Sequence, residues 1–104
     1  MEEIIEKIFT AMEKASGLPR AEILDKSRRS PLPAIRWFIG NELMILGYSS
    51  CVASKAIGID HATLLYGRKQ IPIMSKDKRW KYELDIYNKF KEIYNADRQE
   101  QLQS

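Results

Sequence analysis

Apolar residues recur at helical spacing along most of the chain. The recurring apolar positions are Ile4, Ile5, Ile8, Phe9 and Met12, then Ile35, Phe38, Ile39, Leu43 and Leu46, then Leu64 and Ile71, and finally Trp80, Leu84, Ile86, Tyr87, Phe90 and Ile93. Intervals of three and four residues place side chains on one face of an α-helix. No alternating run of apolar and polar residues is long enough to form a strand. The pattern therefore predicts an all-α fold.

Turn-forming residues divide this pattern into about six helices. Glycine and proline punctuate the chain, and serine or aspartate stands where N-caps are expected. The expected helices end at residues 16–19, 24, 47, 57 and 72, and the last one spans residues 76–95. Asp60 can cap the fifth helix, which we expect Pro72 to end.

The length of 104 residues fits one helical domain over residues 1–96. Residues 97–104 are polar, and we expect a disordered tail there. No basic-then-apolar leader opens the chain, and no stretch is long and apolar enough to span a bilayer. These features predict a cytoplasmic protein that does not contact a membrane.

Positive charge is concentrated in the middle of the chain. The formal net charge is +3, yet residues 1–18 and residues 82–104 each carry −2, so that residues 19–81 carry +7. A block of one sign favours an anionic partner that the middle of the chain contacts. A solvated basic surface without a partner is the alternative interpretation of the charge alone.

Residues 50–64 have the spacing of a helix-turn-helix. Ala53 is a small residue that lets a second helix cross closely over the first, and Gly58 frees the backbone for the turn between them. Ile59 follows the turn, and Leu64 anchors the second helix. A second helix of this kind can lie in the major groove of DNA with its first residues at base edges.

The helix that begins near Asp60 has a buried side and an outward side when Leu64 is taken as the centre of the buried side. Asp60, Gly67, Arg68 and Ile71 then lie on or near the buried side; Ala62, Tyr66 and Lys69 face away; His61 and Thr63 lie on the flanks. Side chains of the first turn project beyond the helix end, where they can reach a ligand.

The first turn of this helix carries side chains that can distinguish bases. Asp60 can accept a hydrogen bond from a cytosine amino group, His61 can bond a base acceptor, and Ala62 offers a methyl group to thymine. The predicted phosphate contacts on the same helix are Thr63, Tyr66 and Lys69. The alternative for His61 is a structural or idle role, as is usual for a lone histidine.

The run from Asp60 to Ile71 resembles the signature of a known DNA-binding family. Its residues D-H-A-T-L-L-Y-G-R-K-Q-I look like the pattern R-D-H-T-T-V-x-H-A-x-x-K-I in the C-terminal DNA-binding domain (domain IV) of DnaA, the bacterial replication initiator. Upstream, the helix ending at Leu43 looks like the long helix of that domain, and residues 26–29 look like its basic loop. The resemblance covers residues 20–72, about half of the chain.

The resemblance implies a Trp-repressor-like helix-turn-helix domain that binds double-stranded DNA at a short asymmetric site. Asp60, His61 and Thr63 match the family residues that read bases in the major groove. The family also places a loop arginine in the minor groove, for which Arg28 and Arg29 are the candidates. Lys26 and Arg36 are further candidates for contact with the DNA backbone. The implied role is regulation of replication initiation or of transcription.

The chain departs from the family pattern at several positions. Ala62 stands where the family has a threonine that contacts a base, Ile59 where it has an arginine, and Tyr66 where it has a histidine near the phosphates. Pro33 falls at a phosphate-binding arginine, a loss for which Arg36 can compensate. These changes bear on which DNA sequence is bound rather than on the class of ligand. No G-x-x-x-x-G-K-[ST] loop is present, so ATPase activity of the initiator's kind is not expected.

The alternative function is that of a degenerate helix-turn-helix used for protein-protein interaction or dimerisation. Pro33, Ile59 and Ala62 favour this alternative. Ile59, Leu65 and Tyr66 would then line an exposed apolar patch for a regulatory partner or for a second copy of the chain.

An enzyme is not expected, because no pair of carboxylates and no nucleophile beside a base stands out. Cys51 is expected to be a small buried or half-buried residue. One cysteine and one histidine cannot form a metal site by themselves, so no metal and no other cofactor is expected.

Overall fold

The helical spacing of the apolar residues is confirmed in the computed structural model, which describes the backbone of residues 2–25 and 29–103 and the side chains of residues 3–25 and 29–96. This part of the chain forms six α-helices and one short 3-10 helix, and it contains no strand. The helices are α1 (Glu2–Ser16), α2 (Arg20–Leu24), α3 (Leu32–Ile45), α4 (Ser50–Ile57), α5 (His61–Met74), η1 (Lys78–Trp80) and α6 (Lys81–Gln103).

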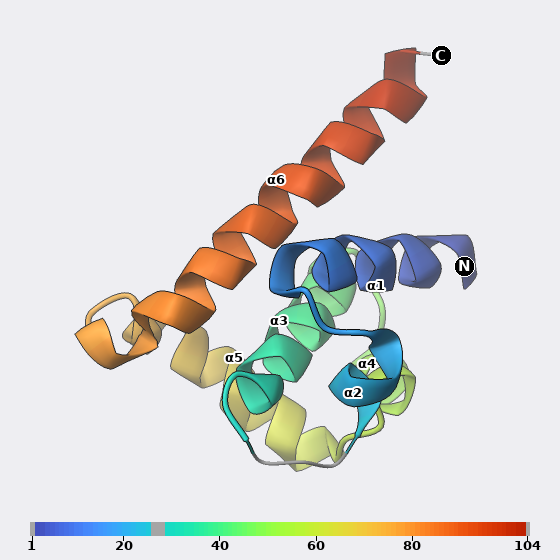
Figure 1. Ribbon diagram of the computed structural model, residues 1–104. Coiled ribbons are helices and arrows are strands. Elements are labelled where there is room, and N and C mark those ends of the chain that lie inside the picture. The colour runs from blue at the N-terminus through green and yellow to red at the C-terminus, as the bar shows by residue number, and fades with distance from the viewer. Residues whose placement is uncertain (1, 26–28, 104) are drawn as a thin grey trace.

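Helix α3 lies at the centre of the fold, in contact with each of the other five α-helices (Figure 1). Its apolar residues are distributed around most of the helix, which is the pattern of a helix with neighbours on several sides. Ile35, Phe38, Ile39 and Leu43 are all fully buried. Burial of each such side chain stabilises the fold by about 1.5–3 kcal/mol.

Helices α1 and α6 pack against each other and cover one side of α3. Phe9 of α1 and Phe90 of α6 are fully buried in this layer. The Tyr87 ring of α6 stacks on Phe38 of α3 with ring centroids 4.2 Å apart. Beyond Tyr94, which is still buried, the C-terminal part of α6 projects away from the other helices, as the red end of the ribbon in Figure 1 shows.

Helix α5 does not end at Pro72, as the sequence predicts, but continues to Met74. A proline near the end of a helix removes only one N–H, the one that would bond to the carbonyl of residue 68. Met74 is only 1% exposed, so the last turn brings an apolar side chain into the core. This burial offsets the missing hydrogen bond.

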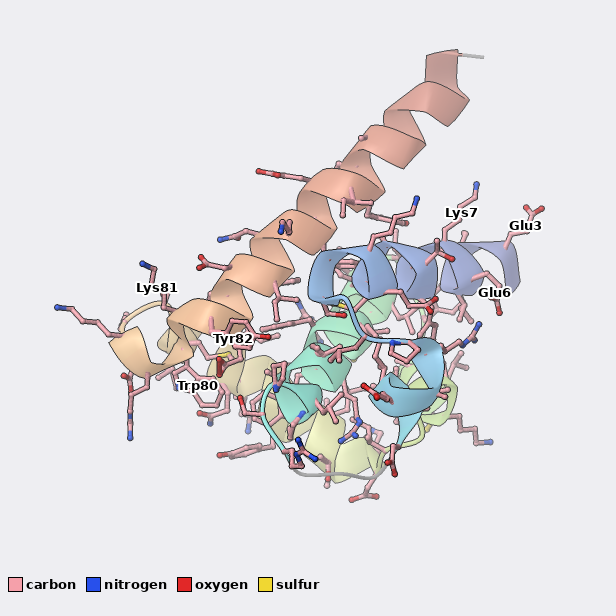
Figure 2. All side chains as sticks on the ribbon, viewed as in Figure 1. Glu3, Glu6, Lys7, Trp80, Lys81 and Tyr82 are labelled. Atoms are coloured by element: carbon pink, nitrogen blue, oxygen red, sulfur yellow. The ribbon has the colours of Figure 1, made fainter. Side chains whose placement is uncertain are left out.

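The bounds predicted for the last helix are wrong at both ends. Residues 78–80 form the separate η1, in which Asp77 accepts a hydrogen bond from the N–H of Arg79 at 3.0 Å. Trp80, labelled in Figure 2, lies at this junction, and its ring centroid is 6.2 Å from that of Trp37. At the other end the helix passes residue 95 and reaches Gln103. The disorder predicted for residues 97–104 concerns motion, and it stays a prediction.

Candidate nucleic-acid interface

Helices α4 and α5 are joined by a tight turn. The Ser49 side chain caps α4 by accepting a hydrogen bond from the N–H of Val52 at 3.2 Å. Gly58 ends the helix with φ of 67°, in the left-handed region that glycine adopts without steric cost. The N–H of Ile59 donates to the Ser54 carbonyl at 3.0 Å. These bonds fix the direction in which the chain enters α5.

Small residues allow the helices of this module to cross closely. Ala53 of α4 is fully buried, as predicted. Gly40 of α3 provides a second close approach that the sequence analysis missed, because a Cβ there would lie 2.4 Å from Leu64 Cδ1 and 3.0 Å from Ile57 Cδ1. Leu64 is fully buried and rests directly on the backbone of α3. The anchoring of α5 through Leu64 is therefore confirmed.

The leading edge of α5, residues 60–63, is exposed at the surface. Asp60 occupies the N-cap position, but its carboxylate makes no capping hydrogen bond. Asp60, expected on or near the buried side, is exposed instead, because its backbone is extended, with φ of −70° and ψ of 146°. His61, Ala62 and Thr63 follow it, all exposed. Four consecutive side chains are thus open to a ligand.

An open groove of about 580 Å³ runs beside the leading edge. It lies where α2 and α3 meet the start of α5, and its lining residues are Leu24, Pro33, Arg36, Trp37, Gly58, Ile59, Asp60 and Thr63. Ile59 is half-buried and packs against the core. In the family pattern this position holds an arginine, so here an apolar contact stands where a cation is expected.

The outward side of α5 carries Tyr66 and Lys69, both exposed as predicted. The Tyr66 ring meets Trp37 edge-on, with centroids 5.8 Å apart and an interplanar angle of 79°. Gly67 makes room for the same indole, because a Cβ at Gly67 would lie 2.2 Å from Trp37 Cγ. The contact fixes the rotation of α5 about its axis, and with it the direction of the leading edge.

A chain of hydrogen bonds ties α5 to α3 and α6. Arg68 donates from Nε to Asn41 Oδ1 at 2.8 Å, and Asn41 donates from Nδ2 to the Tyr87 hydroxyl at 3.1 Å. The Tyr87 hydroxyl donates to Glu42 Oε1 at 2.6 Å. Burial and the neighbouring Glu42 carboxylate raise the pKa of Tyr87 well above its ordinary value. The sequence analysis placed Arg68 near the buried side but gave no sign of this network.

We expect Tyr87→Phe to lower the free energy of unfolding by about 1–2 kcal/mol at neutral pH, because Asn41 and Glu42 lose their hydrogen bonds to a buried hydroxyl-bearing side chain. Urea denaturation measures this loss. Because the folded-state pKa of Tyr87 is raised, its stabilising contribution is complete below pH 10 and is lost as the pH rises towards the folded-state pKa. The stability difference between wild type and variant should therefore narrow above pH 10. The exposed Tyr82→Phe is the control, and a difference that stays constant up to pH 11 would contradict the proposed linkage.

The predicted basic contacts fall into three groups. Lys26 and Arg28 lie outside the described residues. Arg29 is exposed. Arg36 differs from the expectation of a DNA contact: it is only 7% exposed, and its Nε donates to the Ile23 carbonyl at 2.7 Å, which ties α2 to α3. Burial lowers the pKa of the Arg36 guanidinium, and the charge of Asp25 opposes that shift. We leave Arg36 out of the interface.

Acidic side chains lie near the basic ones on this side of the molecule. Glu22 and Asp25 of the α2 region line a cavity together with Arg29. Asp60 adds a third exposed carboxylate at the start of α5. The local charge is therefore mixed, and any affinity for an anion depends on individual cations rather than on a uniformly positive face.

The apolar patch of the alternative function is only partly assembled. Leu65 is 37% exposed and Tyr66 is 56% exposed, as a contact surface requires. Ile59 instead lies in the groove beside Asp60, packed against the core. Leu65 lines a different cavity, together with Lys69 and Pro72.

The described ranges give no support to two other classes of site, a metal centre and a membrane span. Among those residues, no three His, Cys, Asp or Glu side chains lie together so that they could hold a metal ion. None of the described helices combines the length and apolar character needed to cross a bilayer. Cys51 is exposed rather than buried, because the inward positions of α4 are taken by Ala53, Ser54 and Ile57.

The architecture of the chain is a small all-helical domain of six α-helices in its described part. Its resemblance to the DNA-binding domain of the initiator depends on the short run from Asp60 to Ile71, and it stays a prediction. No protein-family model, curated protein or solved structure gives a significant match to this chain.

Proposed function

We propose that this chain binds double-stranded DNA with sequence selectivity, using α5 as the recognition helix. The observation that carries the proposal is the exposed leading edge, residues 60–63, on a helix whose next residue, Leu64, is fully buried. A helix anchored in this way can enter the major groove with its first turn at the base edges. The Asp60 carboxylate is available for this role because it makes no capping bond.

Base choice would come from three residues of the leading edge. Asp60 accepts from a cytosine amino group, His61 bonds a base acceptor, and the methyl group of Ala62 packs on that of thymine. Thr63, Tyr66 and Lys69 face the phosphates, and Arg29 of the preceding loop reaches the backbone or the minor groove. No cofactor and no catalytic step is part of this function, and the role we favour is regulatory, at the start of replication or of transcription.

Electrostatic attraction would supply most of the affinity. A protein that neutralises about four phosphates loses roughly 100-fold in affinity when the salt concentration rises from 50 to 200 mM. The carboxylates of Asp25 and Asp60 limit the number of phosphates that this side can neutralise. We therefore expect clear but moderate salt dependence.

The second candidate is the interaction or dimerisation module, which the exposure of Tyr66 and Leu65 favours. A second copy or a protein partner would then cover this side of α5. Light scattering measures the mass of the chain in solution with and without duplex DNA. A dimer whose formation is abolished by Tyr66→Ser, in a chain that does not bind DNA, would support this candidate over the first.

We expect His61→Ala to reduce the preference between a selected duplex and a random duplex about tenfold, because one base contact is lost. Lys69→Ala should instead weaken binding to both duplexes equally and reduce the slope of affinity against salt by about one. Fluorescence anisotropy with labelled duplexes at two salt concentrations measures both effects. The preferred duplex comes from selection out of a random pool.

Lys14→Ala is the matched control for charge, because Lys14 is exposed on α1, which packs against α6 and α3 rather than beside the leading edge. It should leave both affinities and the salt slope nearly unchanged. Equal losses on both duplexes for His61→Ala would refute its assignment as a base contact. Binding that does not respond to salt would refute the proposed function as a whole.

A further inference from the structure

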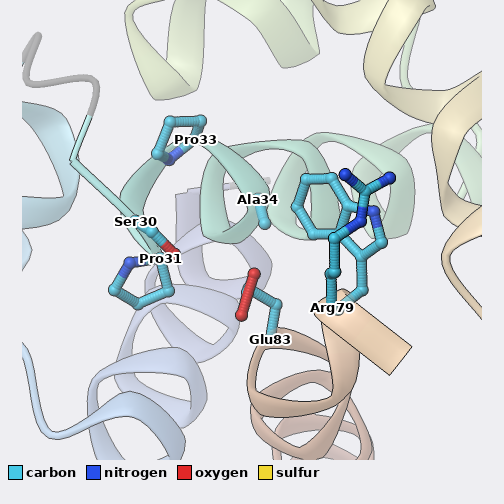
Figure 3. Close-up of a pocket in the computed structure, with 7 residues that line it drawn as sticks. Ser30, Pro31, Pro33, Ala34, Arg79 and Glu83 are labelled. Carbon is cyan, nitrogen blue, oxygen red and sulfur yellow. The ribbon is translucent and has the colours of Figure 1, made fainter. Parts of the chain in front are cut away.

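A second cavity, of about 350 Å³, shares only Pro33 with the groove beside the leading edge of α5. It is enclosed by the start of α3 with its preceding turn, by η1 and by the first turn of α6 (Figure 3). Its lining residues are Ser30, Pro31, Pro33, Ala34, Arg79, Trp80 and Glu83. Most of this lining is apolar, and the volume falls within the range of small-molecule sites in proteins.

The Glu83 carboxylate is directed into this cavity. Figure 3 shows it extending from α6 towards Ala34, between Pro31 and Arg79. Glu83 is only 6% exposed, and no hydrogen bond or ion pair joins it to any other residue of the described part of the chain. Burying an ionised carboxylate costs free energy unless a donor or a cation compensates it. The cavity therefore holds a carboxylate that has no partner within the described part of the chain and that a ligand with hydrogen-bond donors can pair.

Of the groups that line the cavity in the described part of the chain, none donates a hydrogen bond to the Glu83 carboxylate. The Arg79 guanidinium is already paired with Asp77, with Nη2 2.7 Å from Oδ2 and Nε 3.0 Å from the same oxygen. This pairing lowers the pKa of Asp77 and raises that of Arg79. On the opposite wall, Pro31 and Pro33 have no N–H to donate.

Glu83 lies in the first turn of α6, where the positive end of the helix dipole favours a negative charge. The dipole of the helix acts on the carboxylate but places no atoms in the cavity in front of it. The helix dipole favours the charge but gives the carboxylate no hydrogen-bond donor, so the cavity in front of it is open to a ligand.

We propose that this cavity binds the ammonium group of an aliphatic amine, with Glu83 as its counter-ion and the apolar walls around its alkyl stem. A primary ammonium offers three donors to one carboxylate, and an alkyl stem matches Pro31, Pro33 and Ala34. The face of Trp80 attracts a cation as well. The amine comes either from a free small molecule or from a lysine side chain of another protein. This inference does not depend on DNA binding.

Isothermal titration calorimetry on the full chain tests the inference with three probes: pentylammonium, neutral pentanol of the same shape, and a blocked lysine (Nα-acetyl-lysine methylamide). We expect pentylammonium to bind at least tenfold more tightly than pentanol. Glu83→Gln, which keeps the shape of the side chain, should remove this difference. Without any ligand, Glu83→Gln should melt at a temperature equal to or higher than that of wild type, since it removes a buried unpaired charge.

Glu92→Gln is the matched control, because it removes one carboxylate from an exposed position of the same helix. It should bind pentylammonium like wild type. Trp80→Leu keeps Glu83 and should weaken pentylammonium binding more than pentanol binding, which tests the cavity if Glu83→Gln fails to fold. If the blocked lysine binds as tightly as pentylammonium, the natural ligand is a lysine side chain of another protein. If pentylammonium binds and the blocked lysine does not, the natural ligand is a free amine. Equal binding of pentanol and pentylammonium to wild type would overturn the inference.

Discussion

Replacement of Gly67 by alanine should destabilise the chain by about 3 kcal/mol, the upper end of the range for overpacked cores. A Cβ at this position would lie 2.2 Å from Trp37 Cγ and 2.3 Å from Cδ1. Cγ is the atom of the rigid indole ring that is bonded to Cβ, so the contact cannot be relieved by movement of a flexible side-chain end. Either Trp37 leaves its place between Tyr66 and Trp80, or α5 shifts away from α3. Thermal unfolding should show a midpoint more than 10 °C lower.

Gly40→Ala is the matched control, because Gly40 is also a buried helical glycine with an ordinary φ. The atom nearest to its Cβ would be Leu64 Cδ1 at 2.4 Å, the far end of a flexible side chain, so a smaller loss is expected. Combining Gly67→Ala with Trp37→Leu should recover part of the stability, which a double-mutant cycle measures. Equal losses for the two glycine variants would show that the indole contact is not the cause.

The number and type of the helices could be predicted because helical spacing of apolar residues has one cause, burial of one side of each helix. The expected burial of Phe38, Leu43 and Phe90 is confirmed. Helix ends were predicted less well. Pro72 has a strong local tendency to end a helix, and the burial of Met74, a property of the tertiary structure, overrides it.

The exposure of Ala62 could be predicted from one assumption, that Leu64 points inward, because 100° per residue then fixes its neighbours. The exposure of Asp60 could not, because its extended backbone lies outside the helix. The pairing of Arg68 with Asn41 and Tyr87 could not be predicted. These residues are separated by 27 and 46 positions along the chain, and no local pattern records which helices meet. For the same reason Arg36 was predicted to be an exposed cation. The residues next to it in the sequence do not show that its guanidinium will bond to the Ile23 carbonyl.

Replacement of Leu64 by alanine should lower the free energy of unfolding by about 3 kcal/mol. Leu64 is fully buried, and its methyl groups lie against Gly40, which has no side chain to move into the vacated space. The cavity left between α3 and α5 would therefore not collapse, and the cost of such a cavity adds to the lost burial. Urea denaturation should show a lower midpoint with an unchanged dependence on urea concentration.

The adjacent Leu65→Ala is the matched control, since it removes the same atoms from a side chain that is 37% exposed. We expect it to cost less than about 1 kcal/mol. The comparison also bears on function, because both leucines directly follow the leading edge and only one of them can point inward. A greater loss for Leu65→Ala than for Leu64→Ala would mean that α5 is rotated about its axis. Residues 60–63 would then no longer face outward, and the proposed recognition helix would have to be abandoned along with the orientation of α5.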